Sequence, residues 1–511
     1  MRQKKVTRAT ALAVVAATAL AACGAGASNS EGTSGPAPAG GDTITVALTG
    51  EPTNLDFTTT AGAAIPQALM SNVYEGLVEI DQEGQIRPLL AESWEVSEDG
   101  TTYTFQLRPG ATFSNGEAFT AEDVKFSIER VQSDAWVSSL KSQMDVVESV
   151  TVASDTEVEV HLARPSHAWL FAMGTLVGAM FDPSGVDDLA NEAVGTGPFT
   201  VAEWRRGESI TLAAREDYWG EGPDVDTAVL RYFADAVATT NALRAGDVDV
   251  VYNMQAPELV ETFEGDDAFQ VLEGTSNGEI VLSMNNKAAP FDDVRVRRAV
   301  MHAIDRQAVI DTAWNGYGTM VGAAVPPTDP YYEDLNGVYP YDPERARELL
   351  AEAGYADGLD ITFTVPTRPY ATAVSEIVVS QLAEVGIDAR IESAEFPAVW
   401  LDQVFTRHDY QMSVVLAVEA RDFLNIFNNP DYYIGYDNTR IAPLATAADA
   451  AVDEDEYIAT MKEIVRIVTE DAAADTLFLF PNIVIAKADV TGLPANSVTE
   501  ALDLTEVGRA A

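Results

Sequence analysis

One apolar run at the amino terminus limits what the rest of the chain can fold into. Residues 9–22 are 14 mostly small, apolar residues that follow four basic residues. A helix needs roughly 20 apolar residues to cross a bilayer, so this run is too short for a span and is typical of a secretory signal peptide. No later stretch approaches a membrane span. The sequence therefore predicts a signal peptide over residues 1–22 and a water-soluble, extracytoplasmic body from about Asp42 onward.

The only cysteine of the protein, Cys23, follows Leu20-Ala21-Ala22 at the expected cleavage point. These residues resemble the lipobox of bacterial lipoproteins, and the resemblance implies a diacylglycerol anchor on Cys23. Two acyl chains hold a protein stably at a membrane surface. The alternative is an ordinary secretory signal with an incidental cysteine. Since the residues up to 41 are small, polar and rich in Gly and Pro, we expect residues 23–41 to form a lipidated cysteine and a flexible tether.

The charge of the chain excludes some classes of function. Among 511 residues, 80 are acidic and 31 are basic, which gives a formal net charge of −49. Nucleic-acid binding draws its affinity from Lys and Arg side chains that neutralise phosphates, so no nucleic-acid partner is expected. The acidity is best explained as a solvated surface that keeps the body soluble, with a preference for cationic ligands as the alternative. The length predicts two or three domains.

Strand and helix patterns alternate along the chain. The polar and apolar residues at 43–48 alternate as in a half-buried strand, and residues 361–365 read as a strand followed by a helix over 373–385 and a strand over 387–391. Thr120, with Asp123 three residues later, is typical of a helix start. Another helix is expected to begin at Asp342-Pro343 and to end at Gly354. This order predicts a mixed α/β protein.

No residue pattern in the sequence indicates an enzyme. The four histidines lie outside known catalytic motifs, and no Ser, Cys or Thr has a recognisable base beside it. His161 and His167 flank Pro165, so one helix face cannot present both to a metal. Residues 195–198 contain two glycines of a dinucleotide-binding loop, but Pro198 stands where a helix should begin, so a tight turn is expected. We therefore expect no catalytic residues, no cofactor and no metal site.

A series of short segments carries a resemblance to a known family. The segments, in chain order, are 89–94 (LLAESW), 99–110 (DGTTYTFQLRPG), 113–116 (FSNG), 120–124 (TAEDV), 194–199 (VGTGPF), 218–220 (YWG), 243–249 (LRAGDVD), 285–286 (NN), 291–299 (FDDVRVRRA) and 304–306 (IDR). Together they resemble the family 5 extracellular solute-binding proteins, the receptors of peptide, nickel and oligopeptide ABC importers. The resemblance spans roughly residues 42–492.

This resemblance implies an α/β, three-lobed periplasmic-binding-protein-like fold of class II, cluster C type, with the ligand cleft between two main lobes. Lobe I is expected over residues 42–86, 194–284 and 478–511, lobe II over 87–193, and lobe III over 285–477. The implied function is that of a monomeric, lipid-anchored receptor on the outer face of the cell membrane, or in the periplasmic space where an outer membrane is present. Its implied partners are an ABC permease and its ATPase subunits.

The candidate ligand-binding residues follow from the same resemblance. In dipeptide-binding members an Arg-Pro-Tyr run supplies the arginine that grips the terminal carboxylate of the peptide, and Arg368 with Tyr370 match that run. The planar guanidinium suits a carboxylate because it makes two parallel hydrogen bonds. The alternative is that Arg368 pairs with a neighbouring acid of this acid-rich chain.

The amine-binding run of those members is only partly kept. Those members place the aspartate of a Gly-Trp-x-x-Asp run against the free amine of the peptide. In residues 415–422 of this chain the glycine and the tryptophan are missing, and Glu419 stands at the position of the aspartate. The resemblance implies that Glu419 meets the amine. Alternatively, Arg421 neutralises Glu419 or grips an anionic group of a different ligand.

Aromatic residues complete the expected cleft. They offer flat apolar area with a polar tip, which suits peptide side chains and sugars alike. Trp400 is the main candidate, and the others are Tyr74, Trp94, Tyr432 and Tyr433. We expect capture of short peptides. An oligosaccharide, an opine or a nickel chelate is the alternative ligand class, and an extracellular hydrolase is a remote alternative.

Overall fold

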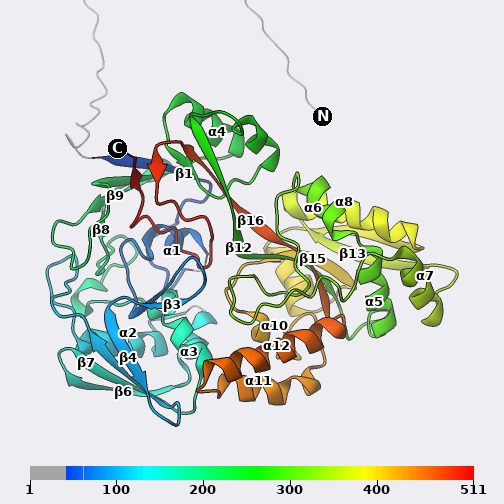
Figure 1. Cartoon of the computed structure of the whole chain (residues 1–511), viewed down its shortest axis with the longest axis horizontal. Coiled ribbons are helices and arrows are strands. Elements are labelled where there is room, and N and C mark those ends of the chain that lie inside the picture. The colour runs from blue at the N-terminus through cyan, green and yellow to red at the C-terminus, as the bar shows by residue number, and fades with distance from the viewer. Residues whose placement is uncertain (1–41, 61, 138, 511) are drawn as a thin grey trace, which may run out of the picture. The chain divides into compact units, whose positions relative to one another are not determined.

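The computed structural model of the protein describes residues 42–60, 62–137 and 139–510, all within one compact unit that extends from residue 41 to residue 511 (Figure 1). The expected signal peptide, Cys23 and the tether lie outside the described residues. No helix of the described part is long and apolar enough to cross a membrane.

A ten-stranded sheet runs through this unit, in the order β14-β13-β15-β12-β16-β11-β1-β10-β9-β8. Its strands are β1 (Thr43–Leu48), β8 (Phe199–Arg205), β9 (Ser209–Ala214), β10 (Thr227–Tyr232), β11 (Val250–Val251), β12 (Phe269–Met284), β13 (Leu359–Pro366), β14 (Ile387–Ala394), β15 (Met412–Ala417) and β16 (Ala474–Lys487). The sheet mixes parallel pairs, such as β1 with β10 and β13 with β14, with antiparallel ones.

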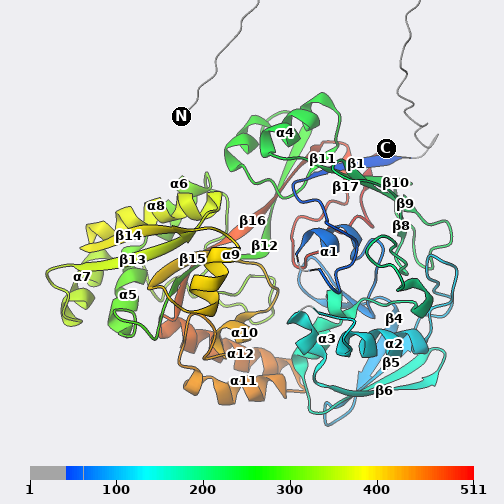
Figure 2. The same ribbon diagram turned by 180° about the vertical axis from the view of Figure 1, so that it is seen from behind.

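Two long antiparallel strands at the middle of the sheet, β12 and β16, connect its two ends (Figures 1 and 2). Their apolar residues change partners along the way. Ile280 and Phe478 pack in a core with the helices around β13, whereas Val484 and Ala486 pack in a core with β1 and β10. The register of the pair shifts between Thr275 and Glu279. The two strands therefore join two separate cores across an irregular segment.

A second sheet, with the antiparallel order β4-β5-β7-β6, shares the core of β1. Its strands are β4 (Ala91–Val96), β5 (Thr102–Leu107), β6 (Val147–Ser154) and β7 (Glu157–Leu162), and two small hairpin-like pairs are β2 (Val78–Ile80) with β3 (Ile86–Pro88) and β17 (Val490–Thr491) with β18 (Gly508–Arg509). The helices near these strands are α1 (Ala64–Leu69), α2 (Ala121–Gln132) and α3 (His167–Ala172), whereas α4 (Ala236–Ala245) packs against β11 of the large sheet.

The remaining helices lie around the other end of the large sheet. They are α5 (Val294–Ala303), α6 (Arg306–Ala313), α7 (Pro343–Glu352), α8 (Pro369–Glu384), α9 (Ala398–Trp400), α10 (Phe423–Phe427), α11 (Ala442–Asp449) and α12 (Glu454–Glu470). Helices α5 to α8 share a core with β13, and α10 to α12 share a further core with Trp400 and Tyr433. The expected lobe boundaries stay predictions.

The structure confirms those predicted strands and helix starts that depend only on a few neighbouring residues. The strand at 43–48 is β1, and Thr120 with Asp123 forms a capping box at the start of α2. Asp342 caps α7 by accepting a hydrogen bond from the Arg345 backbone N–H. The helix expected to begin at 373 begins earlier, at Pro369, because proline fits the first turn of a helix and its preceding residue is extended.

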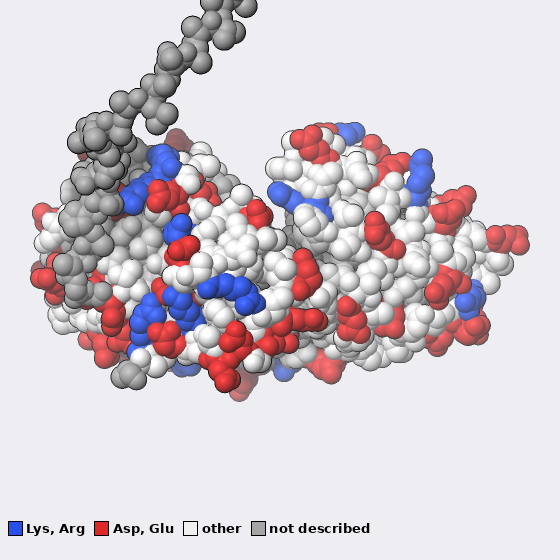
Figure 3. Space-filling model, turned by 90° about the horizontal axis from the view of Figure 1, so that it is seen from above, with Lys and Arg blue, Asp and Glu red and all other residues white. Residues whose placement is uncertain are grey.

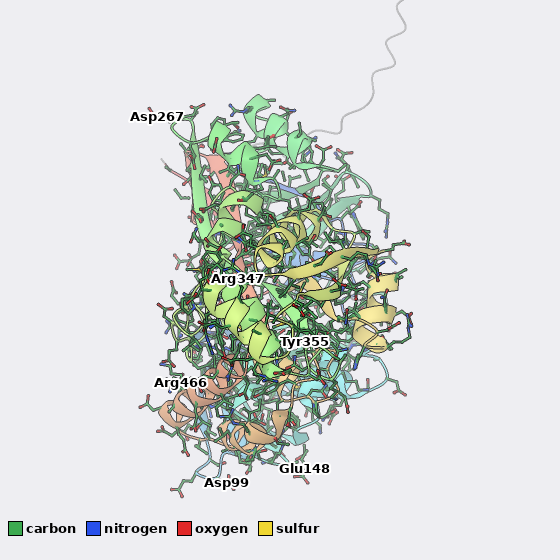
Figure 4. The ribbon with its side chains drawn as sticks, turned by 90° about the vertical axis from the view of Figure 1, so that its right-hand side faces the viewer. Asp99, Glu148, Asp267, Arg347, Tyr355 and Arg466 are labelled. Carbon is green, nitrogen blue, oxygen red and sulfur yellow. The ribbon has the colours of Figure 1, made fainter. Side chains whose placement is uncertain are left out.

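The three acidic side chains with labels in Figure 4 project from the body into solvent. Asp99, Glu148 and Asp267 are all exposed, and Figure 3 shows Asp and Glu spread over the face that it presents. This distribution agrees with the interpretation of the net negative charge as a solvated surface. Some carboxylates are buried instead, and Glu279, Asp329 and Asp422 among them lie at the candidate site.

Candidate functional site

Arg368 and Glu419 follow two neighbouring parallel strands at the same edge of the sheet. Strands β13 and β15 are paired in register, with Thr364 opposite Ser413, and both run toward that edge. Ligands of open α/β sheets bind outside the carboxyl ends of the strands. The Tyr370 hydroxyl oxygen accepts a hydrogen bond of 3.0 Å from the Leu416 N–H, which ties the start of α8 to the end of β15. Burial raises the pKa of Tyr370, so its hydroxyl stays neutral.

The Arg368 guanidinium is exposed, and its carbon lies 4.8 Å from the centre of the Phe396 ring. Among the ion pairs of the described residues, none involves Arg368, although acids are abundant in the chain. No acid of the described residues therefore lies within ion-pair distance of Arg368. The guanidinium is left with its hydrogen-bond donors available to a ligand.

A narrow pocket lies between β12 and the segment that follows β15, and it is too tight to hold a water molecule. Carboxylates dominate its polar wall. Its lining residues are Asn277, Glu279, Ala324, Pro326, Asp329, Glu419, Arg421, Asp422 and Phe423. Glu419 is exposed, whereas Glu279, Asp329 and Asp422 are 3%, 8% and 6% exposed. The pocket therefore has an acidic rim and an acidic interior.

The interior carboxylates hold protons more firmly than ordinary acids. Burial, together with the nearby charges of Asp422 and Asp329, raises the pKa of Glu279 well above its usual range. Burial and the Glu419 charge do the same for Asp422. One carboxylate oxygen of Glu279, Oε2, has no hydrogen-bond partner among the described residues.

A further acid approaches Glu419 from the C-terminal segment of the chain. Glu500 is half-buried, and its burial and the Glu419 charge both raise the pKa of Glu500. Two carboxylates from distant parts of the sequence thus repel each other. A cationic group placed between them would relieve that repulsion.

Arg421 lines the pocket and also contacts other protein groups, so its expected contact with a ligand stays a prediction. Its Nη2 donates a hydrogen bond of 2.8 Å to the Gly84 carbonyl oxygen, and its guanidinium carbon lies 3.9 Å from the centre of the Phe171 ring. Its Nε lies 3.5 Å from Asp329 Oδ1, and both side chains are nearly buried. The backbone at Arg421 is left-handed, with φ of 52°. This conformation turns the side chain toward the β2–β3 turn and α3.

Other contacts join α3 and its preceding residues to helices α11 and α12, which lie beside them in Figures 1 and 2. Arg164 pairs with Asp449, and the Ser166 hydroxyl donates a hydrogen bond of 2.7 Å to the same carboxylate. The His167 ring stacks on Tyr457 with 3.8 Å between centres. His167 is thus held by packing. No group of His, Cys, Asp and Glu residues in the described ranges is arranged to hold a metal ion.

Trp400 lies in the core and not on the pocket wall, which corrects the expectation of a ligand contact. It is 3% exposed, and its Nε1–H donates a hydrogen bond of 3.0 Å to Ser413 Oγ. An indole with its donor already satisfied has no polar group left for a ligand. Tyr74 and Tyr433 are core residues as well, at 0% and 4% exposed, and Tyr432 is half-buried beside Phe405.

The sequence interpretation missed Glu279, Asp329, Asp422 and Glu500. For Glu279 a signal was present, since it is the only charge in the strand segment Asn277–Met284 that is otherwise buried. A charged residue within such a run marks either a strand end or a functional position. No comparable signal marks Asp329 or Glu500, because tertiary packing brings them to the site.

Comparisons with known proteins identify the family. The description "Bacterial extracellular solute-binding proteins, family 5 Middle" matches residues 85–436. The chain belongs to this family.

Its curated relatives and solved neighbours bind different compounds. Heme-binding protein A of Haemophilus influenzae is 30% identical over 63% of this chain and 64% of its own length, and the glutathione-binding protein GsiB of Escherichia coli K12 is 30% identical over 66% of each. The matched part of the chain thus spans just under two thirds of these relatives. The structure of AgaA from Agrobacterium tumefaciens R10, solved with agropinic acid, is 26% identical over 92% of this chain and 99% of its own, with a TM-score of 0.75.

These findings confirm two of the expectations drawn from the sequence. The resemblance to family 5 is confirmed by the match to the family, and the α/β periplasmic-binding-protein fold is confirmed by the superposition on AgaA. Proteins of this family bind solutes, in agreement with the expectation of a receptor and not an enzyme. Heme, glutathione and agropinic acid are chemically unlike one another, so membership alone does not identify the ligand.

Proposed function

We propose that the protein is the substrate-binding component of an ABC importer and that it captures short peptides and delivers them to a permease. The protein is anchored outside the cytoplasmic membrane through lipidated Cys23 and acts as a monomer. Arg368 grips the terminal carboxylate of the peptide, Tyr370 holds the start of α8 in place, and Glu419 meets the free amine at the pocket rim.

One observation carries the proposal of a peptide ligand. An unpaired guanidinium and an acidic pocket lie at the same edge of the sheet, beyond the paired strands β13 and β15. A zwitterionic peptide presents the complementary charges at its two ends. A neutral oligosaccharide would leave both Arg368 and Glu419 without a charged partner, and a dianionic opine would meet the repulsion of Glu419. Glutathione, the ligand named for one relative, is itself an amine-bearing peptide with carboxylate ends.

A thermal-shift screen tests the ligand class. A ligand that binds only the folded state raises the melting temperature with its concentration. We expect tri- and tetrapeptides with free ends to raise the melting temperature by several degrees at millimolar concentration. Cello-oligosaccharides, opines and nickel–histidine are expected to leave it unchanged. A shift with a sugar, an opine or the nickel chelate, and none with any peptide, would contradict the peptide proposal.

The role of Arg368 is tested by its substitution. Arg368→Ala is expected to weaken binding of the free acid Ala-Ala-Ala at least tenfold, because a charge-assisted pair with the carboxylate is lost. Binding of the C-terminal amide should change less than threefold. Isothermal titration measures both affinities, and Arg390→Ala on β14 is the matched control, since Arg390 is exposed and pairs only with Glu392. An equal loss for acid and amide would show that Arg368 does not grip the carboxylate.

A further inference from the structure

We propose that a second cavity, on one face of strands β13 and β14, binds a small organic cation through its guanidinium group. The cavity has a volume of about 390 Å³ and shares no lining residue with the acidic pocket. A cavity of this size accepts a whole small molecule. The proposal goes beyond the peptide ligand and does not depend on it. The lining residues that carry the argument are Thr362, Thr364, Glu392, Gln403, His408 and Asp409.

The cavity lies away from the expected peptide site. Its two threonines alternate along β13 with Phe363, which packs in the core of helices α5 to α8, so the threonines face the other side of the sheet. Residues 408–411 line the cavity just before β15 begins, whereas Glu419 follows the other end of that strand. Figure 2 shows β13, β14 and β15 together with α9 at this end of the molecule. All lining residues fall within 288–411, inside the expected lobe III, so the cavity forms without closure of the lobes.

Hydrogen bonds hold the wall segment before β15 in place. Asn285 Nδ2 donates to the carbonyl oxygens of His408 and Tyr410, both at 3.1 Å. Gln403 Nε2 donates to the Asp409 carbonyl oxygen at 3.1 Å, and the Asp409 N–H donates to the Gln403 carbonyl oxygen at 2.9 Å. The cavity wall is therefore ordered before a ligand arrives, which lowers the entropy lost on binding.

The Thr364 hydroxyl indicates that a ligand belongs in this cavity. Thr364 is 1% exposed and lines the cavity. Its carbonyl oxygen accepts a hydrogen bond of 2.7 Å from Ser413 Oγ, but no hydrogen bond among the described residues involves its hydroxyl. The nearby Thr362 hydroxyl, in contrast, donates to Gln411 Oε1 at 3.0 Å. An unpaired buried polar group costs free energy, and a donor of a bound molecule would remove that cost.

The carboxylates of the lining select a cation. Glu392 binds Arg390 through Oε1 at 2.5 Å, and Asp409 Oδ2 lies 3.4 Å from Arg407 Nη1. Each carboxylate thus keeps a second oxygen that a ligand can use. Arg407 is shared with a further acid, Asp402, at 3.0 Å. Neither arginine lines the cavity, and its described lining contains no Lys or Arg. The cavity therefore offers two carboxylates and no competing cation.

A guanidinium suits these acceptors better than an ammonium or a metal ion. It carries five N–H donors in one plane and can bind a carboxylate through two parallel hydrogen bonds, which leaves donors for the Thr364 hydroxyl oxygen. An ammonium has only three donors. Although His408 lies near Glu392 and Asp409 in the lining, no group of His, Cys, Asp and Glu residues in the described part of the chain is arranged to hold a metal ion.

Isothermal titration with N-acetyl-arginine amide tests this proposal. Both ends of the compound are blocked, so it lacks the charged amine and carboxylate of the proposed peptide ligand. We expect saturable binding by the wild-type protein. N-acetyl-citrulline amide, in which a neutral ureido group replaces the guanidinium, should bind at least tenfold more weakly, and N-acetyl-lysine amide at least threefold more weakly.

Two conservative variants locate the site. Glu392→Gln should weaken binding of the arginine compound at least fivefold, because a charge-assisted hydrogen bond is lost. Thr364→Val, which nearly keeps the shape, should weaken it at least threefold. Asp388→Asn, at an exposed position of β14, is the matched control and should bind as the wild type does. Cooperative urea unfolding of each variant shows that it is folded.

The titration also separates this proposal from the peptide function. Saturating Ala-Ala-Ala should not displace the arginine compound, and if no peptide binds at all, the arginine compound still tests the cavity. Displacement by Ala-Ala-Ala would place the compound in the peptide site and overturn the proposal. It is equally overturned by an absence of saturable binding, by equal affinities for the arginine compound and either analogue, or by an unchanged affinity in either Glu392→Gln or Thr364→Val.

Discussion

Arg421→Ala is expected to lower the free energy of unfolding by about 3 kcal/mol or more at pH 8. Removing one partner of a buried charged pair costs about 3–5 kcal/mol, because the other charge is left without compensation. Here the uncompensated group is Asp329, which is 8% exposed and lies beside the other acids of the pocket. The substitution also removes the hydrogen bond to Gly84 and the contact with the Phe171 ring.

The expected loss depends on pH. Burial raises the pKa of Asp329, and Arg421 partly offsets this rise. Without Arg421 the folded-state pKa of Asp329 rises further, so the folded variant retains a proton that the unfolded chain has released. Stability then falls as the pH rises. The destabilisation by Arg421→Ala should therefore be smaller at pH 5 than at pH 8.

Urea denaturation at the two pH values measures this effect. Arg466→Ala is the matched control, since Arg466 on α12 forms an exposed pair with Glu333 at 2.7 Å and is visible at the surface in Figure 4. Exposed pairs contribute little to stability, so this variant should behave like the wild type. An Arg421→Ala protein as stable as Arg466→Ala at pH 8 would show that Arg421 does not support the pocket.

The strands and helix starts that could be predicted from the sequence are those that depend on residues close together in the chain. The alternation in residues 43–48 and the pairing of Thr120 with Asp123 involve residues within one strand or one turn, and both are present. The start of α8 was placed four residues late because the apolar pattern of that helix begins only after its first turn.

The site was harder to predict because contacts across long sequence distances decide it. Arg421 was taken as a ligand contact from its position beside Glu419, but its partners Gly84 and Phe171 lie more than 200 residues away. The sequence alone cannot distinguish a tryptophan that contacts the ligand from one that packs in the core. In the structure Trp400 packs in the core, where its indole N–H donates a hydrogen bond to Ser413 on the following strand. The pairing of β13 with β15 that brings Arg368 and Glu419 to one edge likewise depends on the sheet order.

The free energy of unfolding of the ligand-free protein should fall as the pH rises above 5. Glu279 and Asp422 have folded-state pKa values well above those of ordinary acids, so above the ordinary pKa of an acid the folded state holds protons that the unfolded chain has lost. Each such group lowers stability by about 1.4 kcal/mol per pH unit until it ionises in the folded state. The two carboxylates interact, so they titrate as a pair, and the decrease should be steepest while both remain protonated.

Glu279→Gln separates this effect from the many exposed acids of the chain. The amide cannot titrate, so the variant should show a slope smaller by about 1.4 kcal/mol per pH unit and should exceed the wild type in stability at pH 8. Urea denaturation at one-unit intervals measures both slopes, with Glu273→Gln as the control that keeps the wild-type slope. A Glu279→Gln slope equal to that of the wild type would mean that Glu279 is already ionised in the folded protein.

Ligand binding should reverse the same loss of stability. The carboxylates that destabilise the empty protein at high pH are those that a bound ammonium would neutralise, so saturation with an amine-bearing peptide should flatten the pH dependence of the wild-type protein. The N-acetylated peptide should leave the slope unchanged, since it brings no cation to the pocket rim. A binding protein with this property is least stable when it is empty and the pH is high.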